Sequence, residues 1–357
     1  MQVDMHYFGT YTLARTAGLL PHFARIVATS SQFVDDNVDD IAIEFSDGGQ
    51  VRCSASGHHG HYIENISPHD QRTIWVPFHF LPGGEGETFT QRLMCKKNSP
   101  ILQEMLEHHL TLSHTPYAPF LLGIAAHVLF DSYAHYNFSG VSSRTNHVQQ
   151  DTIKILEPHH SQAALDEHRN NFFERFTHDT PNIRTNAKEE LPTGALGHGT
   201  VCNYPDTPFL TWSYQPETTE PKTIRRSNTD DYMEAAEHLY TYFVRFAELR
   251  PDLTDASPVP FEDIMPTISV MLMTPGTKHE RSGLWQVAMA QGAFLQGTDE
   301  EIPPYAGDMW KRKQQELATC PDCAFITDMD IYKFHQAAEV HRAYILTELL
   351  PAHDILV

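Results

Sequence analysis

The chain has 357 residues, of which 41% are hydrophobic and 11% aromatic, enough to build a sizeable buried core. Its 25 Lys and Arg stand against 46 Asp and Glu, which gives a formal net charge of −21. Such an acidic balance disfavours tight binding to nucleic acid, which relies on clustered Lys and Arg. The 23 histidines exceed what packing or charge balance requires. Because imidazole is the commonest metal ligand, this composition favours a metalloprotein.

The sequence shows no signal-peptide pattern at its amino-terminal end, and no apolar run approaches the roughly 18 residues of a membrane span. We therefore expect a cytoplasmic protein without a transmembrane segment, with export by a signal-less route as the alternative. Five cysteines are too few and too scattered for a disulfide framework. Cys320 and Cys323 form a CxxC motif, which we interpret as a turn with two thiols. Half of a structural zinc site, a redox pair and a local disulfide are the alternatives.

Helical periodicity dominates the first 137 residues. A helical hairpin is predicted over residues 4–34, and two further helices over residues 99–113 and 117–137. Between the hairpin and these helices, the stretch 35–90 is rich in Asp, Gly, His and Pro. It predicts a long structured loop with two strand-like pieces, Ile41–Phe45 and Thr73–Phe80.

Helices are also the main elements predicted for the rest of the chain. A polar helix is expected over residues 147–178, and an irregular stretch over 180–230. Four further helices are predicted at 229–249, 262–272, 280–294 and 328–349. Because strand signals are few and short, we predict a mainly α fold, a single helical domain over residues 1–357 with long loops.

The predicted helix 117–137 carries the most informative motif. His127, Asp131 and His135 follow one another at i, i+4 and i+8, so that their side chains stack along one face of the helix. The rest of this helix is apolar, which indicates burial. A buried Asp between two His needs a compensating charge, and a divalent cation supplies it most directly. The alternative is a core helix whose polar groups are satisfied by hydrogen bonds.

Five other segments place metal-competent side chains in suitable surroundings. Asp4 and His6 precede the first predicted helix, and the adjacent carboxylates Asp35 and Asp36 follow the second. His79 lies in the aromatic stretch 75–82. His198 lies between two glycines, and Asp206 follows shortly after it. We expect the adjacent histidines His108 and His109 and the helical pair His335 and Glu339 to lie on the surface. His341 is not placed in the site.

Taken in chain order, these motifs resemble the zinc-dependent phospholipase C and single-strand-specific nuclease superfamily. The resemblance is carried by His6 before a helix, by the Ser31-x-x-x-Asp35-Asp36 segment, by His79, by the HxxxD motif at His127 with the following His135, and by His198. It is concentrated in residues 1–212, while residues 229–349 add helices. A closer similarity is to an uncharacterised bacterial group of that type.

The resemblance implies an all-α, phospholipase C/nuclease-like helical bundle that holds two or three zinc ions, or other divalent metals, in a cleft. Under it, His6 binds one zinc, Asp35 bridges two and acts as the catalytic carboxylate, and His79 completes a neighbouring site. His127, Asp131 and His135 form the central ligand group, with His198 as a further ligand and Asp206 as a last carboxylate. Asp4 takes the place of the processed amino-terminal Trp of the secreted relatives. The HxxxD-to-His spacing is shorter than in those relatives, and their third-site HxxxE motif is missing from its place.

The function that the resemblance implies is hydrolysis of a phosphodiester by metal-activated water. A phospholipid is the first choice of substrate, because the acidic chain makes nucleic acid less favourable and because aromatic residues such as Trp75, Phe80, Phe209 and Trp212 could line an apolar rim. The same rings could stack on bases, so a single-strand nuclease is the alternative. A non-catalytic metal-binding helical protein remains a third possibility, which would have a closed coordination shell.

Overall fold

The computed structural model describes residues 1–357 except 46–47, 58–66, 157–195, 219–221, 296 and 318–325. Helices dominate this described part, with short strands in two small antiparallel sheets, so the predicted mainly α character is confirmed. Within it, no helix combines the length and the apolar character needed to cross a lipid bilayer.

The helical hairpin predicted over residues 4–34 is present. It consists of the π-helix η1 (Asp4–Gly9), which continues into α1 (Thr10–Thr16), and of α2 (Pro21–Asp36). Gly18 makes the turn between them at a φ of +97°, where a Cβ would lie only 2.4 Å from the carbonyl oxygen of Ala256. Glycine is therefore required at this turn.

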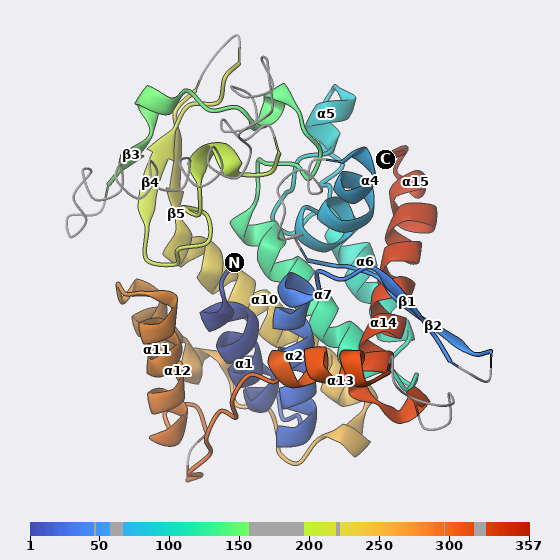
Figure 1. Ribbon diagram of the computed structural model, residues 1–357. Coiled ribbons are helices and arrows are strands. Elements are labelled where there is room, and N and C mark those ends of the chain that lie inside the picture. Colours follow the sequence, from blue (N-terminus) through green and yellow to red (C-terminus); the bar gives the residue numbers. More distant parts are fainter. Residues whose placement is uncertain (46–47, 58–66, 157–195, 219–221, 296, 318–325) are drawn as a thin grey trace.

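The helix that carries the HxxxD motif lies in the middle of the molecule (Figure 1). This helix, α7 (Ala118–Ala134), is buried at every residue, as its all-round apolar sequence requires. It packs against α2 and α6 (Pro100–Thr111), and on other sides against α10 (Asn228–Leu249) and α14 (Asp330–Tyr344). The two helices predicted over residues 99–113 and 117–137 are thus confirmed.

The region 35–90 contains one of its two predicted strands. β1 (Ile41–Glu44) pairs with β2 (Gln50–Cys53) as an antiparallel hairpin. The strand predicted over Thr73–Phe80 is wrong, because these residues belong to the π-helix η2 (Gln71–His79), preceded by the short α4 (Pro68–Asp70). Their aromatic and β-branched composition suggested a strand, but packing against α7 decided the helix. A short helix, α5 (Phe89–Arg92), follows.

The prediction of a polar helix over 147–178 is wrong for its first ten residues. They form a 3₁₀ turn at Gln150–Thr152 and the strand β3 (Lys154–Ile155), and the rest of that range lies outside the described residues. β3 pairs with β4 (Thr211–Tyr214), which pairs with β5 (Ile224–Ser227), all antiparallel. These strands of two and four residues are too short to give a clear alternation in the sequence.

The carboxyl-terminal helices agree with the prediction and add to it. α11 (Phe261–Met273), α12 (Lys278–Ala290) and α14 correspond to predicted segments, while α13 (Gly307–Leu317) was not predicted. The π-helix η8 (Ile345–Leu349) and α15 (Leu350–Ala352) follow α14. Cys320 and Cys323 lie outside the described residues.

The close approach of α2 and α7 depends on Gly123. A Cβ on this residue would lie 2.3 Å from the carbonyl oxygen of Val27 and 2.5 Å from the Cβ of Ser30, both on α2. We therefore expect Gly123→Ala to lower the free energy of unfolding by about 1–3 kcal/mol, because the helices must move apart. Denaturant unfolding followed by circular dichroism measures the difference.

Gly283 of α12 supplies the control, since a Cβ there would meet nothing within 4 Å. Gly283→Ala should leave the stability unchanged or raise it by roughly 0.5–1 kcal/mol, the usual gain of Ala over Gly inside a helix. Equal effects of the two substitutions would contradict the role of Gly123.

Candidate metal centre

Eight of the ten residues predicted as metal ligands come together in three groups, each of which could hold a metal ion. The ligating atoms of each group lie within 4.8 Å of one another. The groups are His6, His127 and Asp131; Asp35, His79 and His127; and His135, His198 and Asp206. These residues come from the amino-terminal hairpin, from η2, from α7 and from the loop after residue 195, so that only the tertiary fold unites them.

The carboxylate of Asp131 lies between these groups. Its Oδ2 atom is 3.0 Å from His127 Nε2 and 3.3 Å from His79 Nδ1, while its Oδ1 atom is 3.2 Å from His6 Nε2. Burial by itself would raise the pKa of Asp131, but the imidazoles and the amino group around it hold this pKa well below its usual range. Asp131 is therefore a buried anion that several nitrogen atoms face.

Backbone carbonyls fix the tautomers of His127 and His79, which both contact Asp131 Oδ2. His127 Nδ1–H donates to the carbonyl of Ser31 over 2.8 Å, and His79 Nε2–H donates to the carbonyl of Ser56 over 2.7 Å. A carbonyl oxygen can only accept, so each neutral ring presents its other nitrogen as a lone pair. These two nitrogens, His127 Nε2 and His79 Nδ1, lie 3.1 Å apart and both face Asp131.

The third group repeats this arrangement. His135 Nδ1–H donates to the carbonyl of His79 over 2.9 Å, and its Nε2 lies 3.1 Å from Asp206 Oδ1. His198 Nδ1–H donates to the carbonyl of Cys202, and its Nε2 lies 3.5 Å from Asp206 Oδ2. Metal-binding histidines characteristically donate their second N–H in this way, which orients the ring and sets the tautomer.

This set of donors fits divalent cations. Lone pairs of neutral imidazoles that face carboxylates repel one another unless a positive charge lies between them. Protons can relieve part of this repulsion, and Asp131 and Asp35 do raise the pKa of His127 against the lowering effect of its burial. Burial, however, lowers the pKa of His198 to about 4, so that this ring stays neutral near pH 7. Metal ions would compensate all three groups together.

His6 adds an independent sign of a missing ligand. Nδ1 of this fully buried ring lacks a hydrogen-bond partner among the described residues, while Nε2 lies 3.2 Å from Asp131 Oδ1. The ring stacks on His127 with a centroid distance of 4.0 Å. Burial, and then the neighbouring His127, lower the pKa of His6 well below its usual value. A buried imidazole nitrogen without a partner is costly, and a bound cation would remove that cost.

A positive group already occupies part of this space. The amino group of Met1 lies 2.6 Å from Asp131 Oδ1 and 3.3 Å from Asp206 Oδ1. Burial by itself would lower its pKa, but these carboxylates raise it to about 11. The point where the two carboxylates converge therefore favours a cation.

The groups differ in their access to solvent. The side chains of His6 and His127 are fully buried, whereas 27% of the Asp35 side chain is exposed. In the third group, the exposed fractions are 17% for His198 and 15% for Asp206. Water and a substrate would therefore reach the centre from the side of Asp35 and of the third group.

Two predicted ligands lie elsewhere. Asp4 forms a two-pronged ion pair with Arg281 of α12, with distances of 2.7 and 3.2 Å, and does not take the place of an amino-terminal ligand. Asp36 accepts a hydrogen bond from the Tyr305 hydroxyl over 2.6 Å. Both side chains thus have partners outside the three groups. Asp35 belongs to one group, and Asp131 holds the shared central position that the resemblance gave to Asp35.

Sequence reasoning missed the groups that orient these ligands. The carbonyls of Ser31, Ser56 and Cys202 have no signature in the sequence, because every residue carries a carbonyl. Gly57 is a residue whose type reflects the site, because a Cβ there would lie 2.1 Å from the carbonyl oxygen of Asp35. Two ligands, His6 and His79, lie in π-helices, a conformation that is rare and often found at functional sites.

The aromatic residues expected to line a rim are mostly core residues. Phe80, Trp212 and Tyr214 are 0–1% exposed and pack together in one hydrophobic cluster, while Trp75 and Phe209 are partly buried against it. The prediction of an open aromatic rim is therefore wrong for the buried rings, because they are needed to cover the sheet β3–β4–β5.

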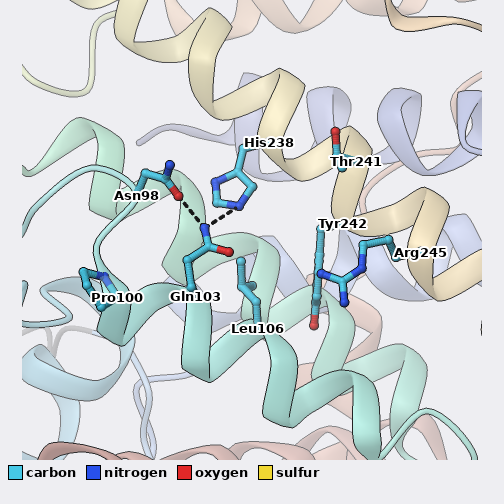
Figure 2. A pocket seen from close by; sticks show the side chains of 8 residues that line it. All are labelled: Asn98, Pro100, Gln103, Leu106, His238, Thr241, Tyr242 and Arg245. Carbon is cyan, nitrogen blue, oxygen red and sulfur yellow. Dashed lines mark hydrogen bonds between the residues drawn. The ribbon is translucent and has the colours of Figure 1, made fainter.

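A separate pocket of about 440 Å³ lies between α6 and α10 (Figure 2). Gln103 Nε2 donates to His238 Nε2 over 3.0 Å there, and His238 Nδ1 lies 3.2 Å from the hydroxyl of Tyr133 on α7. None of the candidate metal ligands lines this pocket. It is distinct from the metal centre.

Comparison with known proteins gives a family and no function. No curated protein matches the chain, and no solved structure matches it. One family model, described as a family of unknown function (DUF6765), matches residues 1–349. Since this match spans nearly the whole chain, the protein belongs to that family of unknown function.

Proposed function

We propose that this protein binds two or three zinc ions in its three His/Asp groups and hydrolyses phosphodiesters with a metal-activated water. One observation carries the proposal: four histidines, each with one N–H donated to a backbone carbonyl, direct their other nitrogen towards the carboxylates of Asp131 and Asp206. These are His79, His127, His135 and His198. Nitrogen and carboxylate ligands of this kind suit zinc, although other divalent metals accept them as well.

Bound zinc would acidify a water molecule towards neutral pH and neutralise negative charge on a phosphate. The residues that would hold it are the eight of the three groups. His127 belongs to two groups, but its Nδ1–H donates to the carbonyl of Ser31, so only its Nε2 could bind an ion, in one of the two groups. Sites only a few ångströms apart are typical of hydrolases that act on phosphate esters.

Asp35 is the carboxylate best placed to act on the attacking water. It is the most exposed of the acidic ligands, and its Oδ1 lies 3.7 Å from His79 Nδ1 and 3.8 Å from His127 Nε2. Burial raises the pKa of Asp35, although both histidines oppose this. A carboxylate at the solvent-facing side can accept a hydrogen bond from water and orient it towards a phosphorus atom.

The proposed substrate class is a phospholipid before a nucleic acid. The net charge of −21 repels a polyanionic strand, whereas a zwitterionic headgroup carries a single diester. This preference now depends on charge alone, since most of the aromatic rings that suggested an acyl-binding rim are buried. A non-catalytic metal protein is less favoured, because structural zinc sites are closed and this centre has an exposed side at Asp35.

The shared position of His127 gives a test of metal binding. We expect the purified protein to retain two or three zinc ions per chain after dialysis, measured by elemental analysis. His127→Ala should lower this content, because His127 is the one nitrogen ligand common to two groups, and His198→Ala should lower it through the third group. Removal of the metal by a chelator should also lower the melting temperature, since a ligand that binds only the folded state stabilises it.

The control is His114→Ala, which removes an exposed histidine and should leave the zinc content unchanged. A wild-type protein without bound metal after supplementation with zinc would sink the proposal. Equal losses in all three variants would contradict the assignment of the groups.

The adjacent carboxylates Asp35 and Asp36 give a test of catalysis. We expect Asp35→Asn to reduce hydrolysis of bis-p-nitrophenyl phosphate by about 100-fold or more, because the water loses its orienting carboxylate. Asp36→Asn should retain most of the activity, since Asp36 contacts Tyr305 and no group of the centre.

The folded state of both variants is checked by circular dichroism. Wild-type activity in Asp35→Asn would show that another group does this work. Hydrolysis of phosphatidylcholine vesicles and of single-stranded DNA, measured side by side, distinguishes the two substrate classes.

A further inference from the structure

We propose that His341 and Arg342, adjacent residues of α14, are positioning residues that hold His79 in the metal centre. The inference deepens the proposed function and rests on it, since it assigns a role to two residues outside the three groups. It also gives the carboxyl-terminal part of the chain, to which the resemblance does not extend, a direct connection to the site.

His341 binds the π-helix that carries His79. Its Nε2–H donates to the carbonyl of Pro77 over 2.8 Å. In a π-helix this carbonyl would accept from the N–H five residues later, but that residue is Pro82, which has no N–H. The orphan carbonyl at the end of η2, two residues before His79, therefore takes its hydrogen bond from another helix.

Arg342 connects the same π-helix to the loop that orients the ring of His79. Its Nε–H donates to the carbonyl of Thr73 over 2.8 Å, and its Nη2 donates to the carbonyl of Ala55. Ala55 precedes Ser56, whose carbonyl accepts the Nε2–H of His79. One guanidinium thus fixes the distance between the helix that carries the ligand and the carbonyl that sets its tautomer.

Two further histidines continue the hydrogen bonds of His341 away from Pro77. Because His341 donates from Nε2, its neutral ring has a lone pair on Nδ1, which accepts from His109 Nε2–H over 2.9 Å. His109 Nδ1 must then accept, and it lies 3.2 Å from His108 Nδ1. The ring of His108 stacks on Tyr344 with a centroid distance of 3.5 Å. The expectation that His109 lies on the surface is wrong, since it is only 4% exposed.

The direction of these hydrogen bonds is therefore set by the carbonyl of Pro77. Burial lowers the pKa of His341 to about 4 and that of His109 well below its usual value, so that both rings are neutral at pH 7. A neutral chain of imidazoles with one possible direction of donation orders its members, as satisfied buried polar networks do.

Cobalt(II), used as the probe in place of zinc, tests this proposal on the full-length protein. Its affinity is measured by competition with a chelator, and its visible absorption bands report the geometry of the ligands. We expect His341→Leu to weaken cobalt binding by about 10–100-fold and to change these bands, as the loss of groups behind a metal ligand usually does. His341→Gln should restore most of the affinity, since an amide can donate to Pro77 and accept from His109.

His335→Leu is the matched control. His335 is also buried on α14, 2% exposed, but it bonds Gln314 over 3.0 Å instead of η2. This variant should lose stability and keep the cobalt affinity and spectrum. If His341→Leu does not fold, Arg342→Gln is used instead. This variant loses the contact with Thr73 or Ala55, and we again expect weaker cobalt binding and changed absorption bands.

The outcomes separate the two proposals. Wild-type protein that binds neither cobalt nor zinc would overturn the proposed function itself. If the wild type binds cobalt and His341→Leu binds it equally well, only the positioning role is overturned. The same holds for Arg342→Gln where His341→Leu does not fold. A loss of affinity in His335→Leu equal to that in His341→Leu would overturn it as well, because the effect would then follow from stability.

Discussion

The structure depends on one buried anion, the carboxylate of Asp131. An ionised carboxylate in the interior is stable only when positive or hydrogen-bonding groups surround it. Here histidines from three different elements and the amino group of Met1 face it. The helix α7 that carries it is buried on all sides, so the surrounding helices are also arranged around this charge.

The backbone does as much as the ligands to define the centre. Each of four histidines donates one N–H to a carbonyl, which leaves the other nitrogen directed inward. Those carbonyls belong to α2, to the loop before residue 58, to η2 and to the turn after His198. In the proposed role of His341 and Arg342, side chains in turn position the backbone. They would bind carbonyls of η2 and of the loop before residue 58, which position His79. The ligands are thus positioned by contacts between elements far apart in the sequence.

The predictions succeeded where local chemistry was decisive and failed where it was not. The apolar helix with His127 and Asp131 was recognisable because a polar pair in a buried segment is costly without a partner. The strand predicted around His79 was wrong, because aromatic and β-branched residues also fit a helix that packs on α7. The resemblance suggested Asp4 as a substitute for an amino-terminal ligand, but its carboxylate forms an ion pair with Arg281 on a distant helix. His109 was wrongly expected on the surface, since adjacent histidines on a helix give no sign of which one is buried.

The sequence by itself determined the mainly helical character, the central helix and the residue types that a metal centre requires, because periodicity and the cost of buried charge are local properties. It also singled out eight residues that the fold brings into three groups. Only the tertiary structure decided which nitrogen of each histidine faces inward, which of the adjacent carboxylates Asp35 and Asp36 turns towards the centre, and which carbonyls orient the rings. The physical reason is that hydrogen-bond direction and the convergence of charges are properties of atoms brought together across the chain, and no spacing in the sequence encodes them.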